Sequence, residues 1–210
     1  TYTAKYALAT PSAPVITVLY ADEKKAFVYG ETCGASIKKE TAPDGIVYSY
    51  EWFDENGNTL DCSQDGSVLS IANANVGEIK ITSKITASAE GYTSVFATSH
   101  ATIVVEKATL SVVFDEINIV YGQDLPECSL RFNGFECEDD ESVVDKTDIT
   151  TSTSYKKGSG VGKYRIVISG LKANNYKFAG SGENGAIVST INVGKRVLAI
   201  KDVALEKTYD

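Results

Sequence analysis

The sequence predicts an all-β protein built from two tandem β-sandwich domains, and three observations support this fold class. Apolar and polar residues alternate with a period of two along most of the chain, and no segment shows sustained helical periodicity. Clusters of Gly, Asn and Asp interrupt these runs, as turns between short strands do. A similar order of motifs recurs after about ninety residues, as it does in tandem repeats.

The repeated pattern can be followed through three pairs of equivalent positions. The pairs are Tyr29 and Tyr121, Gly77 and Gly162, and Lys107 and Lys195, separated by 92, 85 and 88 residues. Thr208-Tyr209-Asp210 stands where a third copy would place its own Tyr-Gly turn. Chains of such tandem copies are usually extended arrays, so we expect the domains to lie in an elongated arrangement.

The phase of the repeat predicts the domain limits. Residues 1–13 form the tail of an upstream unit or a linker, residues 14–106 the first β-sandwich, residues 107–195 the second, and residues 196–210 the opening strand of a further repeat. Both junctions are short and lack the Gly, Ser and Pro of flexible linkers, so neighbours should keep a limited range of orientations. Because the pattern is incomplete at both ends, we expect the chain to be part of a longer protein.

The clearest strand of the first copy carries an aromatic stripe. Tyr48, Tyr50 and Trp52 alternate with polar residues up to Asn56-Gly57, a dipeptide typical of hairpin turns. Aromatic rings of this kind can form a platform that stacks on a glycan, but the alternation favours the core of a sandwich. We therefore predict that Trp52 is buried.

Three other segments are informative about local structure. Residues 79–86 and 164–169 alternate apolar and polar side chains as half-buried strands do, and residues 136–148 form an acidic stretch in which we expect a helical turn. Tyr92 and Tyr176 follow Gly or Asn, and we expect them to pin their loops onto the core, as tyrosine corners do.

Composition excludes several classes of partner. Apolar content of 43% and charged content of 23% are ordinary for a globular protein. A net charge of −8 argues against nucleic acid and against an anionic membrane surface, since both demand Lys and Arg. No stretch approaches the roughly 20 apolar residues that cross a bilayer, so we expect no membrane insertion within this segment.

The four cysteines are divided equally between the copies, Cys33 and Cys62 in the first and Cys128 and Cys137 in the second. The absence of Cys-x-x-Cys argues against zinc ribbons and thioredoxin-type redox sites. Structural disulfides among these four residues and free, buried thiols are both compatible with the pattern. Asn133-Gly134 predicts a hairpin turn, which would place Cys128 and Cys137 diagonally on one face.

Residues 121–195 contain a spaced set of Tyr, Gly and Asn motifs. These are Tyr121-Gly122, Pro126, Gly134-Phe135 with the acidic run behind it, Gly160 to Tyr164, Ser169-Gly170, Ala173 to Tyr176, and the closing strand near Ile187 to Val193. In this spacing the segment resembles the MBG repeats, the "mostly beta, glycine-rich" domains of bacterial surface proteins. Residues 196–210 look like the opening strand of another such repeat. The resemblance carries over no active-site residue.

The first copy departs from this pattern. Tyr48 to Phe53, followed by Asn56-Gly57 and Leu60, looks like strand C of an immunoglobulin-like domain. Together, the two resemblances imply a bacterial, exported, multi-domain protein that is extracellular, either on the cell surface or secreted.

Two glycine-rich segments need separate interpretation. Gly180 to Gly185 matches Gly-x-Gly-x-x-Gly, but a dinucleotide loop works only between a strand and the N-terminus of a helix. Here β-type residues follow from Ala186, so we interpret the segment as a hairpin loop. Gly158 to Gly162 likewise leads into a strand and is interpreted as a turn.

No residue set predicts catalysis or metal binding. His100, the only histidine, lacks the companions of a catalytic triad or zinc site and is interpreted as a surface or strand-edge residue. The acidic run from Glu136 to Asp148 lacks the ligand pattern of an EF-hand, and a solvated loop is the favoured interpretation over a calcium site. Asp54 to Asn58 is explained as a turn. We therefore expect no catalytic, cofactor-binding or metal-binding residues, no cofactor, and no enzyme activity.

The sequence favours non-enzymatic structural modules that form the stalk of a large exported surface protein and space a distal functional region from the cell. The expected partners are then neighbouring repeats of the same chain. The alternative is an adhesin, or an accessory module of a carbohydrate-active enzyme, that binds a glycan or a host surface protein. The stalk is favoured because no exposed aromatic cluster can be identified.

Overall fold

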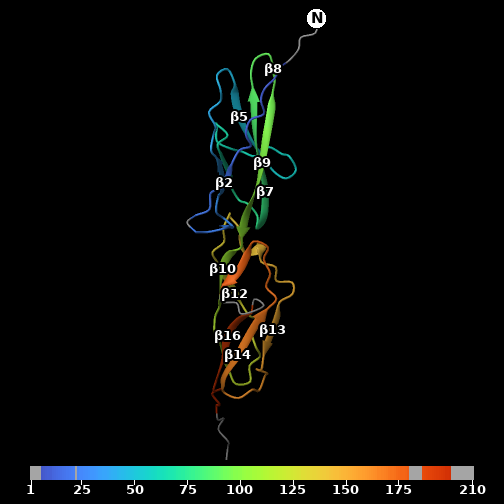
Figure 1. Ribbon diagram of the computed structural model, residues 1–210. Coiled ribbons are helices and arrows are strands. Elements are labelled where there is room, and N and C mark those ends of the chain that lie inside the picture. The colour runs from blue at the N-terminus through green and yellow to red at the C-terminus, as the bar shows by residue number, and fades with distance from the viewer. Residues whose placement is uncertain (1–5, 22, 180–185, 200–210) are drawn as a thin grey trace, which may run out of the picture. The chain divides into compact units, whose positions relative to one another are not determined.

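The computed structural model describes residues 6–21, 23–179 and 186–199, which form strands joined by turns and loops (Figure 1). Within these ranges the one helical element is the 3₁₀ turn η1 (Glu141–Val143), which lies in the acidic stretch as predicted. The predicted all-β fold class is therefore confirmed.

The chain is divided into two compact units. The first consists of Thr1–Thr109, Gly134–Val143 and Ala173–Lys177, and the second of Leu110–Asn133, Val144–Lys172 and Phe178–Asp210. Residues 107–109 and two short later segments of the range 107–195 are thus assigned to the first unit. The domain limits expected from the repeat phase stay a prediction.

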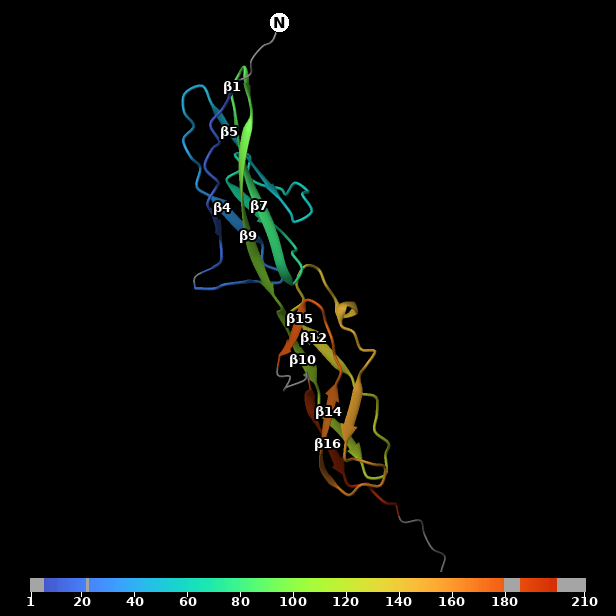
Figure 2. The same ribbon diagram turned by 45° about the vertical axis from the view of Figure 1, so that its right-hand side comes forward.

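The first unit contains a three-stranded and a four-stranded sheet, which Figure 2 shows from a second direction. The strand orders are β2 (Ile16–Val18), β4 (Cys33–Ile37), β6 (Val68–Ile71), and β3 (Phe27–Val28), β9 (Val95–Glu106), β7 (Gly77–Ser88), β5 (Val47–Phe53). Neighbouring strands are antiparallel except for β3 and β9, which are parallel. A short parallel pair joins β1 (Tyr6–Ala7) to β8 (Tyr92–Thr93).

The core of the first unit follows the predicted alternation. Strands β4 and β7 bury every second side chain over most of their length. Trp52 is fully buried, Tyr50 is buried and Tyr48 is half-buried, so these rings belong to the core and form no exposed glycan platform. The prediction for Trp52 is confirmed.

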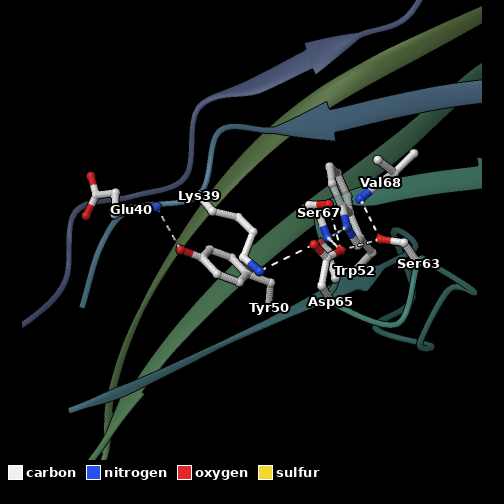
Figure 3. A network of polar contacts seen from close by, with 9 residues as sticks. Lys39, Glu40, Tyr50, Trp52, Ser63, Asp65, Ser67 and Val68 are labelled. Carbon is white, nitrogen blue, oxygen red and sulfur yellow. Dashed lines mark hydrogen bonds and ion pairs between the residues drawn. The ribbon is translucent and has the colours of Figure 1, made fainter. Parts of the chain in front are cut away.

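A turn before β6 holds Trp52 in place (Figure 3). The indole Nε1 of Trp52 donates a 2.9 Å hydrogen bond to the carbonyl oxygen of Gly66. The neighbouring Asp65 carboxylate accepts hydrogen bonds from the hydroxyls of Ser63 and Ser67, both at 2.7 Å, and from the backbone N–H of Ser67 at 3.0 Å. Hydrogen bonds from Ser67 and then Ser63 hold the pKa of Asp65 well below its usual range.

Gly66 is required at this turn for two reasons. Its φ of +69° lies in the left-handed region, where any residue with a Cβ atom is destabilised by steric strain. A Cβ atom here would also lie 2.4 Å from the carbonyl oxygen of Tyr50, closer than any real contact. No flexible side chain could move aside, because the obstacle is backbone.

Substituting Gly66→Ala should therefore lower the free energy of unfolding of the first unit by about 3 kcal/mol or more. Gly57→Ala is the matched control, because Gly57 also has positive φ but open space around it, and should cost only about 1 kcal/mol. Urea unfolding followed by the fluorescence of Trp52, the single tryptophan, reports on the first unit. Equal losses in both variants would show that the close approach to Tyr50 does not limit this turn.

The second unit contains most residues of another pair of sheets. The strand orders are β12 (Leu130–Asn133), β10 (Ala108–Phe114), β15 (Tyr176–Ala179), and β11 (Ile117–Val120), β16 (Ile187–Gly194), β14 (Gly162–Ser169), β13 (Thr150–Thr153). As in the first unit, the short strand of the four-stranded sheet, β11, pairs in parallel with the last long strand, β16.

A buried cluster fills the second unit. Its members are Ile119, Tyr155, Ile166, Ile191 and Val193. The cluster comes from β11, β14, β16 and the segment between β13 and β14, so the alternation predicted for residues 164–169 is confirmed. The Tyr155 hydroxyl finds a backbone partner, the carbonyl oxygen of Gln123, at 2.5 Å.

The two predicted Asn-Gly hairpins have different outcomes. At Asn56-Gly57 the turn is confirmed, with Gly57 N–H donating to the Asp54 carbonyl at 3.1 Å. The hairpin at Asn133-Gly134 is wrong, because β12 pairs with the earlier strand β10, Asn133 opposite Ser111. Phe132 is buried in this pairing, and packing of β12 on β10 outweighs the local turn preference.

The glycine-rich segments also differ. Ser159 N–H donates to the Lys156 carbonyl at 2.8 Å, and β14 begins at Gly162, so the turn predicted at Gly158 to Gly162 is confirmed. Gly180 to Gly185 lies outside the described residues. The strands that flank it, β15 and β16, belong to different sheets.

Candidate functional site

The same turn occurs once in each unit, where a short strand ends. We call it the Tyr-Gly-x turn: Tyr29-Gly30-Glu31 follows β3, and Tyr121-Gly122-Gln123 follows β11. Tyr29 N–H donates to the carbonyl oxygen of Glu106 and Tyr121 N–H to that of Gly194, both at 2.9 Å. Each turn therefore extends the parallel ladder by one hydrogen bond before the chain leaves the sheet.

The glycine of each turn has a left-handed backbone, with φ of +97° at Gly30 and +85° at Gly122. Glycine adopts this conformation without the steric cost that a Cβ atom imposes. The tight turn is closed by a backbone hydrogen bond from the third residue to the last residue of the strand, at 2.9 Å in the first unit and 3.1 Å in the second.

The third residue also closes the turn with its side chain. A carboxylate oxygen of Glu31 accepts the N–H of Val28 at 2.8 Å, and the amide oxygen of Gln123 accepts the N–H of Val120 at 2.8 Å. Glu and Gln have the same length and both offer an oxygen, so either satisfies this donor. The chemistry explains why x is Glu in one copy and Gln in the other.

The strand registers show that the repeat found in the sequence is structural. Gly77 pairs with Val105 in the first unit, and Gly162 pairs with Val193 in the second. The ladders therefore match Gly77 with Gly162, as the spacing of the motifs predicts.

Within the first unit, the Tyr-Gly-x turn is covered by a cluster of aromatic rings around a carboxylate. Tyr29 and Tyr176 pack edge to face with ring centroids 5.4 Å apart, and Phe135 packs against Tyr176 at 5.9 Å. The hydroxyls of Tyr29 and Tyr176 both donate to Oδ2 of Asp139, at 3.0 and 2.6 Å. We call Tyr29, Phe135, Asp139 and Tyr176 the Tyr29 cluster; all four belong to the first unit.

Burial keeps both phenols of this cluster neutral. Desolvation, followed by the hydrogen bond to Asp139, raises the pKa of Tyr29 to about 12. The same two causes raise the pKa of Tyr176. A neutral phenol can donate to the carboxylate, whereas two phenolates beside Asp139 would repel it. The arrangement is suited to holding chain segments together.

A second set of contacts holds the segment Ala173 to Tyr176, which we call the Ala-Asn-Asn-Tyr loop. Lys107 Nζ donates to the carbonyl oxygen of Ala173 at 2.9 Å, and Ala108 N–H donates to that of Asn175 at 3.0 Å. The side-chain oxygen of Asn175 accepts the N–H of Val76 at 3.4 Å. These donors belong to the first unit, as does the loop.

The two tyrosines expected to pin loops differ in outcome. Tyr176 is 2% exposed and the prediction is confirmed, whereas Tyr92 is 45% exposed, so the prediction that it pins its loop onto the core is wrong. Tyr29 can be identified in the sequence through the repeat, whereas the contacts of Asp139 and Asn175 cannot. The signal for Asn175 was its place in the Ala173 to Tyr176 motif.

All four cysteines carry free thiols in the structure. Cys33 is fully buried in β4, and burial followed by the charge of Glu31 raises the pKa of its thiol. Cys128 is half-buried against the second core, and burial raises its pKa as well. Cys62 is exposed and Cys137 half-buried. Structural disulfides among these residues stay a prediction.

The remaining polar candidates are satisfied locally. His100 is exposed on β9 with Nδ1 2.8 Å from the Thr82 hydroxyl, which confirms a surface residue. In the acidic run, hydrogen bonds from the hydroxyl and backbone of Ser142 lower the pKa of Asp140, as those of Thr147 do for Asp145. These carboxylates close turns of their own segment.

Two negative findings apply to the described ranges. Among residues 6–21, 23–179 and 186–199, no three or more His, Cys, Asp or Glu side chains are grouped where they could hold a metal ion. Within the same ranges, no helix has the length and apolar character needed to cross a membrane.

The fold and the paired turns define a class: a tandem β-sandwich protein whose units each contain a Tyr-Gly-x turn. Residues 110–185 match the model of the MBG domain (YGX type), the family that the second copy resembles in sequence. MBG domains are typically non-catalytic modules of extracellular or surface proteins. The match fits a module of a bacterial surface protein.

Several solved structures show weak similarity. The fibronectin(III)-like modules of Clostridium thermocellum CbhA are 13% identical, with a TM-score of 0.29 and coverage of 91% of this chain and 100% of theirs. The insect immune protein hemolin is 12% identical, with a TM-score of 0.38 and coverage of 87% of this chain and 47% of its own. Bacteroides ovatus SGBP-B, solved with a mixed-linkage heptasaccharide, is 14% identical, with a TM-score of 0.30 and coverage of 88% of this chain and 48% of its own. At these scores the similarity has no bearing on function. A comparison with curated proteins found no match.

Replacing Glu31 with Ala removes the acceptor for the Val28 N–H. We expect the free energy of unfolding of the first unit to fall by roughly 0.5 to 1 kcal/mol, because the bond is solvent-accessible. Glu31→Gln reproduces the oxygen that Gln123 supplies in the second unit and should retain most of this stability. Urea unfolding followed by Trp52 fluorescence distinguishes the two variants.

Acid provides a second test of the same turn. The hydrogen bond from Val28, and then the bond from Lys24, lower the pKa of Glu31 below its ordinary value of 4.5. A lowered folded pKa means that the stabilisation is present above the ordinary value and is lost as the pH falls through the folded value. As the pH falls below 4.5, the free energy of unfolding of the unmodified protein should therefore decrease more than that of Glu31→Gln. Identical acid profiles would contradict the role assigned to Glu31.

Alkali should act on the Tyr29 cluster. Because the folded pKa of Tyr29 is raised from 10.0 to about 12, stability is unaffected below pH 10 and falls as the pH rises from 10.0 towards about 12. Tyr29→Phe should reduce this alkaline loss, and Tyr121→Phe, in the exposed turn, should not change it. Trp52 fluorescence as a function of pH measures the transition. An alkaline profile unchanged in Tyr29→Phe would show that Tyr29 titrates normally.

Proposed function

We propose that the chain supplies non-enzymatic structural modules to a large exported bacterial surface protein, in which tandem domains form a stalk. The stalk spaces a distal functional region from the cell. The proposal places the protein outside the cell, on its surface or secreted, with neighbouring repeats of the same chain as its partners.

One observation carries the proposal. The Ala-Asn-Asn-Tyr loop and Asp139 belong to the stretch that matches the MBG domain, yet they are part of the first compact unit. There they cover Tyr29, which is 7% exposed. The first unit is therefore completed by segments that follow Lys107 in the chain, which argues against a free linker after this residue.

The residues that follow β9 also make specific contacts within the first unit. Lys107 and Ala108, the two residues that leave β9, both donate hydrogen bonds to the Ala-Asn-Asn-Tyr loop. A Gly/Ser-rich linker makes no such contacts and lets its domains swing.

Small-angle X-ray scattering tests the stalk. A compact particle of this length would have a radius of gyration of about 17 Å, and we expect a value well above it with an elongated distance distribution.

A compact, near-spherical particle would reject the stalk. Saturable binding on a glycan array, abolished by substitution of exposed aromatic residues such as Phe96, would instead support the adhesin alternative.

A further inference from the structure

The surroundings of the two Tyr-Gly-x turns correspond position by position. In each unit, the N–H of the turn tyrosine donates to the carbonyl oxygen of the residue that precedes a lysine. In each unit, a valine also precedes the glycine that begins the long central strand, β7 or β14. The matched residues are Tyr29 and Tyr121, Val76 and Val161, Lys107 and Lys195, and Ala108 and Arg196.

In the first unit this surface is occupied. Three of its four positions hold the Ala-Asn-Asn-Tyr loop: Lys107 through Nζ, and Ala108 and Val76 through their N–H groups. The fourth, Tyr29, packs against Tyr176 of the same loop and donates to Asp139. As a result Tyr29 is 7% exposed and Ala108 is 4% exposed.

In the second unit the same surface is exposed. Tyr121 is 46% and Val161 55% exposed. A hollow of about 670 Å³ lies here, lined by Tyr121, Gly122, Val161 and Lys195 to Ala199. Within the described part of the chain, the Tyr121 hydroxyl and the Lys195 ammonium have no hydrogen-bond partner. Donors and an aromatic face are thus available in the arrangement that holds a loop in the first unit.

We propose that this hollow is the docking site for a further MBG domain, which seats its own Ala-Asn-Asn-Tyr loop on Tyr121. Lys195 Nζ and the N–H groups of Arg196 and Val161 donate to that loop, as their counterparts do in the first unit. The Tyr121 hydroxyl donates to a carboxylate at the position of Asp139. The inference rests on the proposed function, because it treats the chain as one part of a tandem array.

The one substitution among the matched positions favours an acidic partner. In the first unit, Glu136 packs so closely on Gly30 that a Cβ there would lie 2.8 Å from the glutamate side chain. In the second unit, a guanidinium nitrogen of Arg196 is 3.6 Å from the corresponding position at Gly122. An acidic residue equivalent to Glu136 would therefore meet Arg196, which gives this joint a charge pair that the first unit lacks.

The docking site can be tested by adding a second copy of the MBG-like domain after the present chain, at the spacing of the natural repeat. Residues 112–210 of this chain are joined directly after Ala199, which preserves the spacing of 88 residues and retains Arg196. Tyrosines are nitrated with tetranitromethane and located by peptide mass spectrometry, in the present chain and in the extended one. We expect nitration of Tyr121 in the extended chain to fall to the level of Tyr29.

Two matched variants control the result. Asn175→Ala in the appended copy alone should restore nitration of Tyr121 and leave Tyr29 protected. The same substitution in the original copy should expose Tyr29 and leave Tyr121 protected. Hydrogen exchange of the central strand in the appended copy verifies that this copy is folded in each variant.

The docking site would be overturned if the appended copy is folded and Tyr121 is nitrated as readily in the extended chain as in the present chain. Protection of Tyr121 in the present chain by soluble oligosaccharides would also overturn it, by assigning the hollow to a glycan. Scattering separates this result from the stalk: an elongated extended chain with reactive Tyr121 rejects only the docking site, and a compact one with protected Tyr121 rejects only the stalk.

Discussion

The parallel pairing of a short strand with the last long strand is the constraint on which each unit depends. It joins β3 to β9 and β11 to β16, so the beginning of a unit is fixed to its end. The connected strands are far apart in the sequence, and the closure entropy must be offset by well-formed contacts. The Tyr-Gly-x turn supplies them, with a left-handed glycine, a ladder hydrogen bond and a side-chain acceptor for the last strand N–H.

The turn also determines where its tyrosine lies. Because the glycine redirects the chain immediately after the ladder ends, the ring is left at the rim of the sheet. In the first unit that ring is buried under Tyr176 and donates to Asp139. A phenol is well suited to this position, since its ring packs in an edge-to-face pair and its hydroxyl finds a polar partner. A phenylalanine would keep the packing but leave the carboxylate with one donor fewer.

The sequence predicted the parts of this arrangement that local chemistry determines. Alternation identified the strands and the buried Trp52, and the recurrence of Tyr-Gly located both turns, because few residues other than glycine adopt positive φ. The partners of Tyr29 were not predictable in this way. Asp139 is 110 residues away, and no local pattern distinguishes it from the other acids of its run. The Asn133-Gly134 hairpin failed for a related reason, since its turn preference is local whereas burial of Phe132 against β10 is not.

The contacts that complete the first unit join two surfaces of different chemistry. One surface, around the Tyr-Gly-x turn, supplies most of the donors; another, the Ala-Asn-Asn-Tyr loop with its acidic companion, supplies most of the acceptors. A contact between two unlike surfaces is heterologous and leaves one surface of each kind unused, so it propagates unless a rotation closes it into a ring. Two like surfaces would instead pair once and stop. Chemistry of this kind therefore suits an array whose length is set by the number of copies in the chain, and it requires a different residue set at the last copy to cover the remaining turn.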